Sequence, residues 1–345
     1  MTLLGVDLAQ MSDHPPFVAT PPILALVAAI GEQVGRLEAS LPPERQLLLR
    51  RTNRLRTIQG SLAIEGNTLT LEQVTAVVAG KRVLGSAREV QEVRGAVAAY
   101  DQLGEWDPTK RDDLLAAHGV LMAGLVDRPG HFRTSPAGIQ RGDQLVHVAP
   151  AAGQVRALMN DLLAWLKATE DHLLIAACVF HYEFEFIHPF VDGNGRMGRL
   201  WQTLILSRWK PLFALVPVES LIRDQQAGYY AALNESNRAG ASTPFIAFML
   251  QVIHDTLAVL DATPQVTPQV APQVARLLSA LTGDLDRAAI QKALGLADRK
   301  SFSLRYLQPA MEAGLIELTR PDAPNSRFQK YRLTARGREV RERGL

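Results

Sequence analysis

The chain has 345 residues, of which 47% are hydrophobic and 21% are charged, and its formal net charge is +2. This length predicts two or three domains, and the composition is that of a globular protein rather than a disordered one. The near-neutral charge excludes nucleic-acid binding by the chain as a whole, so any such contact would need a local basic patch.

Localisation is predicted from the cysteine content and the apolar runs. The single cysteine, Cys178, lies in an apolar run and is expected to be buried and unreactive. Residues 1–20 have no basic start and contain Pro15 and Pro16, so we expect an arm there and no secretory signal. We also expect no apolar run to span a bilayer. Together these features predict a cytoplasmic protein without membrane contact.

The first part of the chain is predicted to be helical, because its apolar residues recur at helical spacing. Arginines of the second helix fall mostly off its apolar stripe, and we expect them to face solvent: Arg50, Arg51, Arg54 and Arg56. His118, in the fifth helix, is expected to be a core or groove residue rather than a ligand. The predicted helices are residues 23–37, 44–65, 70–79, 86–103 and 108–125.

A hairpin and two further helices come next. Residues 138–148 place two short apolar stretches around a Gly-Asp turn, which is typical of a β-hairpin. Residues 154–167 form an amphipathic helical pattern, and residues 171–186 are apolar nearly all round, as in a central helix. That helix would deliver the following residues rigidly.

Residues 186–200 read Phe-Ile-His-Pro-Phe-Val-Asp-Gly-Asn-Gly-Arg-Met-Gly-Arg-Leu and combine three chemistries. His188 can act as a base near neutral pH, and Asp192 is an oxygen ligand suited to Mg²⁺. Successive backbone N–H groups at the start of a predicted helix form an anion site, and nearby guanidinium groups suit phosphate oxygens. These binding residues are Gly193, Asn194, Gly195, Arg196 and Arg199. The stretch therefore predicts phosphoryl or nucleotidyl transfer.

Other motifs fit this stretch poorly. An EF-hand needs glycine and glutamate where Met197 and Thr203 stand, and no Lys-Ser/Thr pair follows the glycines as in a Walker A loop. The sequence holds no HExxH, so His181 is expected to be a packing residue and not a zinc ligand.

The pattern His188-Pro-Phe-x-Asp192-Gly-Asn-Gly-Arg196-x-x-Arg199 resembles the full motif of the Fic domain family. The resemblance extends over about residues 20–260. It implies a helical bundle with a hairpin flap, ATP and Mg²⁺ at the motif, and transfer of AMP to a target protein. His188 would be the catalytic base and Asp192 the metal ligand.

Three further expectations come from the same resemblance. Ser61-x-x-x-Glu65-Gly66 is similar to the inhibitory motif of Fic proteins, in which Glu65 would pair with Arg199 and block the γ-phosphate. Tyr230 and Asn237 would contact the adenine and ribose. The flap at residues 138–148 would bind an extended target segment that presents its hydroxyl.

The last part of the chain changes character. A threefold Pro-Gln-Val repeat predicts an extended linker. Two helices, 286–294 and 299–313, and a two-stranded hairpin then resemble a winged helix. Basic residues in this module, Arg299, Lys300, Arg305, Arg320, Arg327 and Lys330, make DNA one candidate partner. A protein-contact or dimerisation module is the alternative, and homodimerisation remains open.

The expected protein is therefore mainly α: a Fic helical bundle with a β-hairpin flap and a small C-terminal winged-helix domain. Its regions would be a helical region with the inhibitory motif (1–100), the catalytic domain (101–260), the linker (261–275) and the winged helix (276–345). We expect an adenylyltransferase acting on a Tyr, Thr or Ser hydroxyl and restrained by Glu65. Removal of AMP at the same site, or a DNA-binding regulator with the Fic body as nucleotide sensor, are the alternatives.

Overall fold

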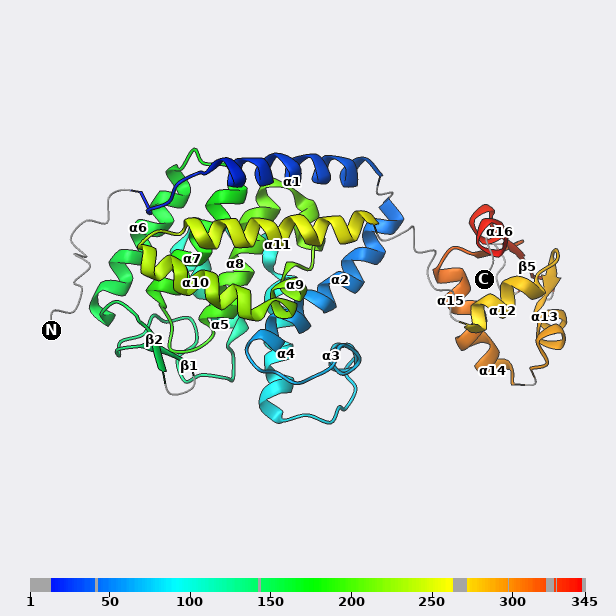
Figure 1. Cartoon of the computed structure of the whole chain (residues 1–345). Helices are drawn as coiled ribbons and strands as arrows, with labels where there is room; N and C mark the ends of the chain where they lie inside the picture. Colours follow the sequence, from blue (N-terminus) through cyan, green and yellow to red (C-terminus); the bar gives the residue numbers. More distant parts are fainter. Residues whose placement is uncertain are drawn as a thin grey trace. The chain divides into compact units, whose positions relative to one another are not determined.

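The computed structural model describes residues 14–40, 43–141, 144–262, 272–296, 298–320, 326 and 328–342. The chain forms two compact units, Met1–Ala262 and Thr263–Leu345. Most of the predicted arm and of the Pro-Gln-Val linker lies outside the described residues. The fold is mainly α, as predicted, with two small sheets (Figure 1).

The described part of the first unit is a bundle of helices with one hairpin. Capping boxes are present at Thr70 and Ser86, each of which accepts a hydrogen bond from the backbone N–H of the third residue of its helix. The helices are α1 (Pro21–Ser40), α2 (Pro43–Ile64), α3 (Leu71–Val78), α4 (Ala87–Asp101), α5 (Arg111–Leu121), α6 (Val155–Ala168), α7 (Leu173–Ile187), α8 (Asn194–Trp209), α9 (Val218–Asp224), α10 (Gln226–Ala239) and α11 (Thr243–Ala262).

Helix α7 is the centre of this unit, as its all-round apolar sequence predicts. Almost every residue along it is buried, and it packs against α6, α8 and α11. Cys178 is fully buried within it, as expected, and burial raises the pKa of its thiol. The residues that follow α7 are thus anchored to the best-packed element of the unit.

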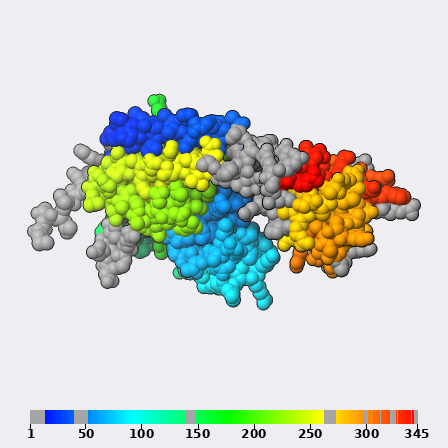
Figure 2. Space-filling model, turned by 45° about the vertical axis from the view of Figure 1, so that its right-hand side comes forward, coloured from blue at the N-terminus to red at the C-terminus, as the bar shows by residue number. Residues whose placement is uncertain are grey.

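Helix α11 corrects the expectation about membrane spans. Its 19-residue segment Thr243–Asp261 is long and apolar enough to cross a bilayer by length and composition, and 44% of it is buried. Its apolar side chains pack within the unit: Phe245, Met249 and Ile253 are fully buried, and α11 lies along α1. Figure 2 shows α1 and α11 side by side on the surface of the unit.

The arginines of α2 are only partly as expected. Arg56 is exposed, but Arg54 is half-buried, donates to the Val97 carbonyl at 3.1 Å and pairs with Asp101 at 2.7 Å. Its side chain therefore connects α2 to α4 instead of facing solvent. The side chains of Arg50 and Arg51 lie outside those described.

The predicted hairpin is present as β1 (Gly138–Arg141) and β2 (Gln144–Val148). The strands are antiparallel, Gly138 lies opposite Val148, and the register shifts between Ile139 and Gln140. The Ala149 N–H donates to the Ala137 carbonyl at 3.2 Å and closes the base of the hairpin. Its turn, residues 142–143, lies outside the described residues.

The second unit has its own hydrophobic core, which includes Leu277, Ile290 and Phe302. The expected helix pair and hairpin are found, with a π-helical turn at Ser303–Leu307. The proline-led helix α12 begins inside the range predicted as linker, since proline is tolerated in a first helical turn. Sequence reasoning missed α12, β3 and α16. The elements are α12 (Pro272–Ala280), β3 (Leu285–Asp286), α13 (Arg287–Leu294), α14 (Arg299–Phe302), α15 (Gln308–Glu312), β4 (Ile316–Leu318), β5 (Lys330–Leu333) and α16 (Ala335–Glu342), with sheet order β3-β5-β4.

Candidate active site

The loop between α7 and α8 begins with a strained residue. His188 is the C-cap of α7 and has φ 50° and ψ 61°, and it is the one non-glycine residue with positive φ in the described parts of the chain. Its N–H donates to the Phe184 carbonyl at 2.9 Å. A left-handed conformation costs about 1–2 kcal/mol for a residue with a Cβ and is retained mainly where it serves function. Here it turns the chain sharply at the imidazole-bearing residue.

The rest of the loop is held by side chains around Phe190. The Phe190 N–H donates to Asn194 Oδ1 at 2.8 Å, and Asn194 Nδ2 donates to the Phe190 carbonyl at 2.9 Å. The side-chain amide of Asn194 is therefore committed to the loop, and its backbone N–H is what it can offer an anion. The buried Asn194 side chain thus fixes the conformation of the loop whose backbone N–H groups form the predicted anion site.

His118 of α5 is buried and contacts the loop at Phe190 and Asp192, which agrees with the expectation of a core or groove residue. Its ring stacks on Phe190 with centroids 3.6 Å apart and an interplanar angle of 5°. Nδ1 accepts from the Gly130 N–H at 2.8 Å, so Nε2 carries the proton and donates to the Asp192 carbonyl at 3.0 Å. Burial lowers the pKa of His118 to about 4, which keeps this donor and acceptor arrangement neutral.

The predicted backbone nest is present at the N-terminus of α8. Gly193 is the N-cap with φ 86°, and a Cβ there would lie 2.6 Å from Met122 Sδ. A Cβ at Gly195 would collide with Glu65 Oε1 and would lie 3.0 Å from Arg199 Nη1. The positive φ of Gly193 favours glycine there, and at Gly195 the missing side chain leaves room for the Glu65 carboxylate, which lies directly against the nest.

Asp192 belongs to a closed ring of four charges. Arg196 Nη2 lies 2.9 Å and Arg88 Nη2 2.8 Å from the Asp192 carboxylate. Glu92 Oε1 lies 3.5 Å from Arg196 Nη1 and 3.4 Å from Arg88 Nε. Arg196 is buried, whereas the Arg88 side chain is 58% exposed. The ring connects the motif loop to α4 of the N-terminal region.

The site fits a Mg²⁺ ion that arrives with a nucleotide. The described residues contain no cluster of three acidic, histidine or cysteine side chains that would hold a metal alone. Mg²⁺ bound with nucleotides commonly takes one or two carboxylates and completes its shell with phosphate oxygens and water. The half-buried Asp192 carboxylate meets that requirement once Arg88, its exposed partner, moves away.

Arg199 is buried in α8 and faces the end of α2. Its Nη2 donates to Glu65 Oε1 at 2.7 Å and to the Ser61 carbonyl at 3.0 Å, and its Nε donates to Ser61 Oγ at 3.1 Å. Gly66, with φ 90°, ends α2 by turning the chain just beyond Glu65. Burial by itself would lower the pKa of Arg199, but the Glu65 carboxylate more than offsets it, and the pKa is raised. The structure thus brings Ser61, Glu65 and Arg199 together.

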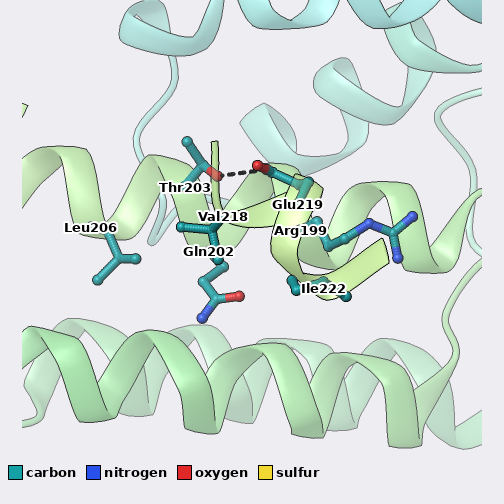
Figure 3. Close-up of a pocket in the computed structure, with 7 residues that line it drawn as sticks. All are labelled: Arg199, Gln202, Thr203, Leu206, Val218, Glu219 and Ile222. Carbon is teal, nitrogen blue, oxygen red and sulfur yellow. Dashed lines mark hydrogen bonds between the residues drawn. The ribbon is translucent and has the colours of Figure 1, made fainter. Parts of the chain in front are cut away.

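Two further carboxylates line the surroundings of Arg199. Glu219 is buried and accepts from Tyr100 Oη at 3.0 Å and from Thr203 Oγ1 at 3.2 Å, and burial raises its pKa. Figure 3 shows Arg199 and Glu219 lining one small pocket. On the α7 side, burial raises the pKa of Glu185 to about 8. Of the acidic groups around Arg199, Glu65 is the one whose carboxylate pairs directly with the guanidinium, at 2.7 Å.

His181 and Tyr230 lie near Arg199, and Asn237 contacts Tyr182 of α7. His181 is a buried packing residue, as expected: its Nδ1 lies 2.7 Å from Gln202 Oε1, and Tyr229 Oη lies 3.1 Å from its Nε2. Tyr230 is half-buried in α10, and burial and then the nearby Glu65 carboxylate raise its pKa. Asn237 Oδ1 accepts from Tyr182 Oη at 2.9 Å. Contact of Tyr230 and Asn237 with a nucleoside stays a prediction.

Sequence reasoning missed several residues that hold the loop. Arg88 and Glu92 lie about a hundred positions before the motif, and no local pattern connects them to Asp192. The loop-positioning role of His118 also leaves no mark in its helical spacing. Arg133 contacts the same loop from the segment before the hairpin, where no sequence pattern singled it out.

Known families and structures match both units. Residues 108–206 match the Fic/DOC family, and residues 272–334 match the domain described as "Filamentation induced by cAMP protein Fic-like, C-terminal domain". A crystal structure of a Fic family protein from Desulfovibrio desulfuricans G20 is 54% identical in sequence. It matches with a TM-score of 0.71 over 93% of this chain and 98% of that one.

Curated relatives match over a shorter stretch. Protein adenylyltransferase Fic of Nematostella vectensis is 32% identical over 58% of this chain and 47% of its own length. Protein adenylyltransferase fic-1 of Caenorhabditis elegans is 34% identical over 55% of this chain and 37% of its own. The chain thus spans less than half of either relative.

The relative from Desulfovibrio desulfuricans G20 is similar over 98% of its own length. The motif brings an imidazole, a carboxylate, a glycine N-cap and two arginines together between the end of α7 and the first turns of α8. On this evidence of sequence and geometry together, the chain belongs to the Fic family.

Proposed function

We propose that the protein is an adenylyltransferase that moves AMP from ATP to a hydroxyl group of a protein. The proposal rests on the loop between α7 and α8, where His188 and the N-terminus of α8 are separated by a single turn of chain. The names of the curated relatives, protein adenylyltransferase Fic and fic-1, support it.

His188 would be the general base. It would accept the proton of a Tyr, Thr or Ser hydroxyl as the hydroxyl oxygen attacks the α-phosphorus. The new bond joins that oxygen to phosphorus, the bond from the α-phosphorus to the bridging oxygen breaks, and pyrophosphate leaves. The rigid α7 and the left-handed turn hold the imidazole in one place for this transfer.

The nest and the arginines would bind the triphosphate. Backbone N–H groups of residues 193–195 donate to phosphate oxygens, and Arg196 stabilises charge on the leaving pyrophosphate. Arg199 would receive the γ-phosphate. Mg²⁺, held by Asp192, would neutralise charge on the phosphate oxygens. Tyr230 and Asn237 would line the nucleoside end.

Glu65 would restrain this activity. Its carboxylate occupies the Arg199 guanidinium and lies against Gly195, where the γ-phosphate would need both. A γ-phosphate cannot share that space with an ionised carboxylate, so ATP would bind in a productive position only after the end of α2 moves away. Ser61 would keep Arg199 oriented meanwhile.

The β1–β2 hairpin would bind the target. Its strands have unpaired backbone edges in the described range, and an extended segment can add to such an edge by main-chain hydrogen bonds. The hairpin is connected to the His188 turn, so a hydroxyl on the added strand would be presented to the imidazole. We propose that the targets are cytoplasmic proteins, or another copy of this chain.

Labelled ATP tests the proposal. The parent, Glu65→Gly and Glu65→Gly/His188→Ala would be incubated with Mg²⁺, lysate and ATP labelled at either the α- or the γ-phosphate. We expect Glu65→Gly to place the α-label on protein and the γ-label on none, and the added His188→Ala to abolish labelling. Transfer of the γ-label would show a kinase reaction instead, and no labelling by Glu65→Gly would overturn the proposal.

A hydrolase working at the same site is the alternative, because Glu65 is placed near the nest and could orient water. Incubating AMP-labelled target with the parent would decide between them. Faster release of AMP by the parent than by Glu65→Gly would favour the hydrolase.

For the second unit we propose duplex DNA as a partner. The helices α13 to α15 and the β4–β5 hairpin support this, as do Arg305 and Arg320, which are exposed. Arg320 lies over the exposed Phe328 ring at 5.5 Å. A DNA duplex should migrate more slowly in a gel with full-length protein at low salt, and this shift should disappear as the salt concentration rises.

The double variant Arg305→Gln/Arg320→Gln should weaken the shift. If the parent gives no shift at low salt, a dimerisation or protein-contact module, or a nucleotide sensor without DNA, would be favoured instead.

A further inference from the structure

Arg133 is a buried arginine whose hydrogen bonds all go to backbone carbonyls. It is 3% exposed, and burial lowers the pKa of its guanidinium. Among the contacts of the described residues, it has no carboxylate partner within ion-pair distance. The guanidinium donates to the carbonyls of His188 (2.8 Å), Ile187 (3.3 Å), Pro150 (2.6 Å) and Ser135 (2.9 Å).

These carbonyls belong to two parts of the chain, the end of α7 and the segments that flank the β1–β2 hairpin, which the proposed AMP transfer must bring together. Ile187 and His188 end α7 and carry the imidazole. Ser135 and Pro150 flank the β1–β2 hairpin on either side. The Arg133 N–H adds a bond to the Pro189 carbonyl at 2.9 Å. One residue thus connects both ends of the hairpin to the catalytic turn.

The cation is stabilised there without a counter-ion. The C-terminal carbonyls of a helix carry partial negative charge and favour a cation. The planar guanidinium has five donors in a fixed geometry, which lets one side chain reach acceptors in several directions. Lysine offers three donors from a single point, so it cannot reproduce the arrangement.

We propose that Arg133 is a positioning residue that fixes the left-handed turn at His188 relative to the target-binding hairpin. The inference rests on the proposed AMP transfer. In it, Arg133 sets the distance between the hydroxyl of a target on the hairpin and the imidazole, without contacting either.

The proposal separates two kinetic effects. Among the described residues, the hydrogen bonds of the Arg133 side chain go to carbonyls outside the nest, so nucleotide binding is expected to survive its loss. Misplacement of a reacting group by about 1 Å can cost about 10²-fold in rate. Loss of Arg133 should therefore lower kcat for transfer and leave the KM for ATP nearly unchanged.

The kinetic test uses Glu65→Gly protein, with Arg133→Gln and Arg133→Lys added separately. We expect Arg133→Gln to lower kcat by about 10²-fold, with the KM for ATP within about twofold, and Arg133→Lys to recover part of the loss. Arg128→Gln, at an exposed position in the same segment, is the matched control and should change neither. A kcat for Arg133→Gln equal to that of its parent would overturn the proposal.

Amide hydrogen exchange provides a readout that does not depend on transfer. In Arg133→Gln and Arg133→Lys, the amides of Ala149 at the hairpin base and of His188 should exchange faster together, while those of α11 keep their protection. Unchanged exchange at both sites would contradict the inference even if kcat fell. If Glu65→Gly transfers no AMP at all, the proposed function fails, and the exchange result still decides the role of Arg133.

Discussion

Glu65 and Arg199 are 134 positions apart in the chain, and their Oε1 and Nη2 atoms are 2.7 Å apart. The arginine is 1% exposed and the glutamate 33% exposed, so the contact joins a fixed cation to a more accessible anion. In the proposed function, the end of α2 would leave with its carboxylate while Arg199 remains in α8. The difference in exposure between the two side chains is consistent with that proposal.

Removing the Glu65 carboxylate should raise activity and lower stability together. In Glu65→Gln we expect AMP transfer to rise and the free energy of unfolding without nucleotide to fall by about 1–3 kcal/mol, because a buried guanidinium loses its charged acceptor. Transfer by α-labelled ATP and chemical denaturation measure the two effects. Glu235→Gln, exposed on α10, is the control, and a Glu65→Gln protein with parental activity would contradict the account.

Gly195→Ala should block the nest even when Glu65 is absent. The added methyl group would lie 3.0 Å from Arg199 Nη1, in space that the triphosphate needs. In the Glu65→Gly background, titration calorimetry with ATP and Mg²⁺ should show at least tenfold weaker binding, about 1.4 kcal/mol. Gly35→Ala, where a Cβ would meet nothing within 4 Å, controls for the substitution itself and should bind as its parent. Equal affinities for the two alanine variants would place the nucleotide elsewhere.

Arg88 should compete with Mg²⁺ for Asp192. In the Glu65→Gly background, Arg88→Ala should lower the Mg²⁺ concentration needed for half-maximal transfer, because the carboxylate loses one cation. The effect should be at most about fivefold, since an exposed ion pair contributes about 0–1 kcal/mol. Arg94→Ala, at an exposed position on the same helix, should leave the Mg²⁺ dependence unchanged. A higher Mg²⁺ requirement in Arg88→Ala would show that Arg88 assists metal binding instead.

Glu185 should make stability depend on pH. Its folded pKa of about 8 lies above the ordinary value of 4.5 because of burial, so the folded protein holds a proton that the unfolded chain loses. Stability from this group therefore falls as pH rises from about 4.5 to about 8, by at most about 1.4 kcal/mol per pH unit.

Glu185→Gln removes that contribution. Compared with the variant, the parent should lose stability between pH 5 and 8, measured by urea denaturation. His181, whose pKa burial lowers to about 3, acts in the opposite sense below pH 6.5. Its Nε2 lies 3.9 Å from Glu185 Oε1, so the two groups are coupled and the clearest comparison is between pH 6.5 and 8. Parallel stability curves across this range would show that Glu185 is ionised in the fold.

Local patterns predicted most of the fold and the centre of the site. The apolar periodicity of α7, the capping residues of α3 and α4 and the glycines after Asp192 act over a few residues, so the sequence displays them directly. The contact of Glu65 with Arg199 was expected only because both residues stand in motifs that resemble those of the family.

Contacts set by packing could not be predicted in the same way. Arg88 reaches Asp192 because α4 packs near the motif loop, and Arg133 reaches His188 because its segment passes under the turn. Helical spacing also suggested that Arg54 faces solvent, whereas Asp101 of α4 pairs with it. In each case the partner is distant in sequence, and only the folded chain brings the two groups together.

The most direct test of the central claim is a crystal structure of the Glu65→Gly protein with ATP and Mg²⁺. The account predicts phosphate oxygens on the backbone N–H groups of residues 193–195, the γ-phosphate at the Arg199 guanidinium, and the α-phosphorus facing the His188 imidazole. A nucleotide bound elsewhere, or a nest left vacant at saturating ATP, would contradict it.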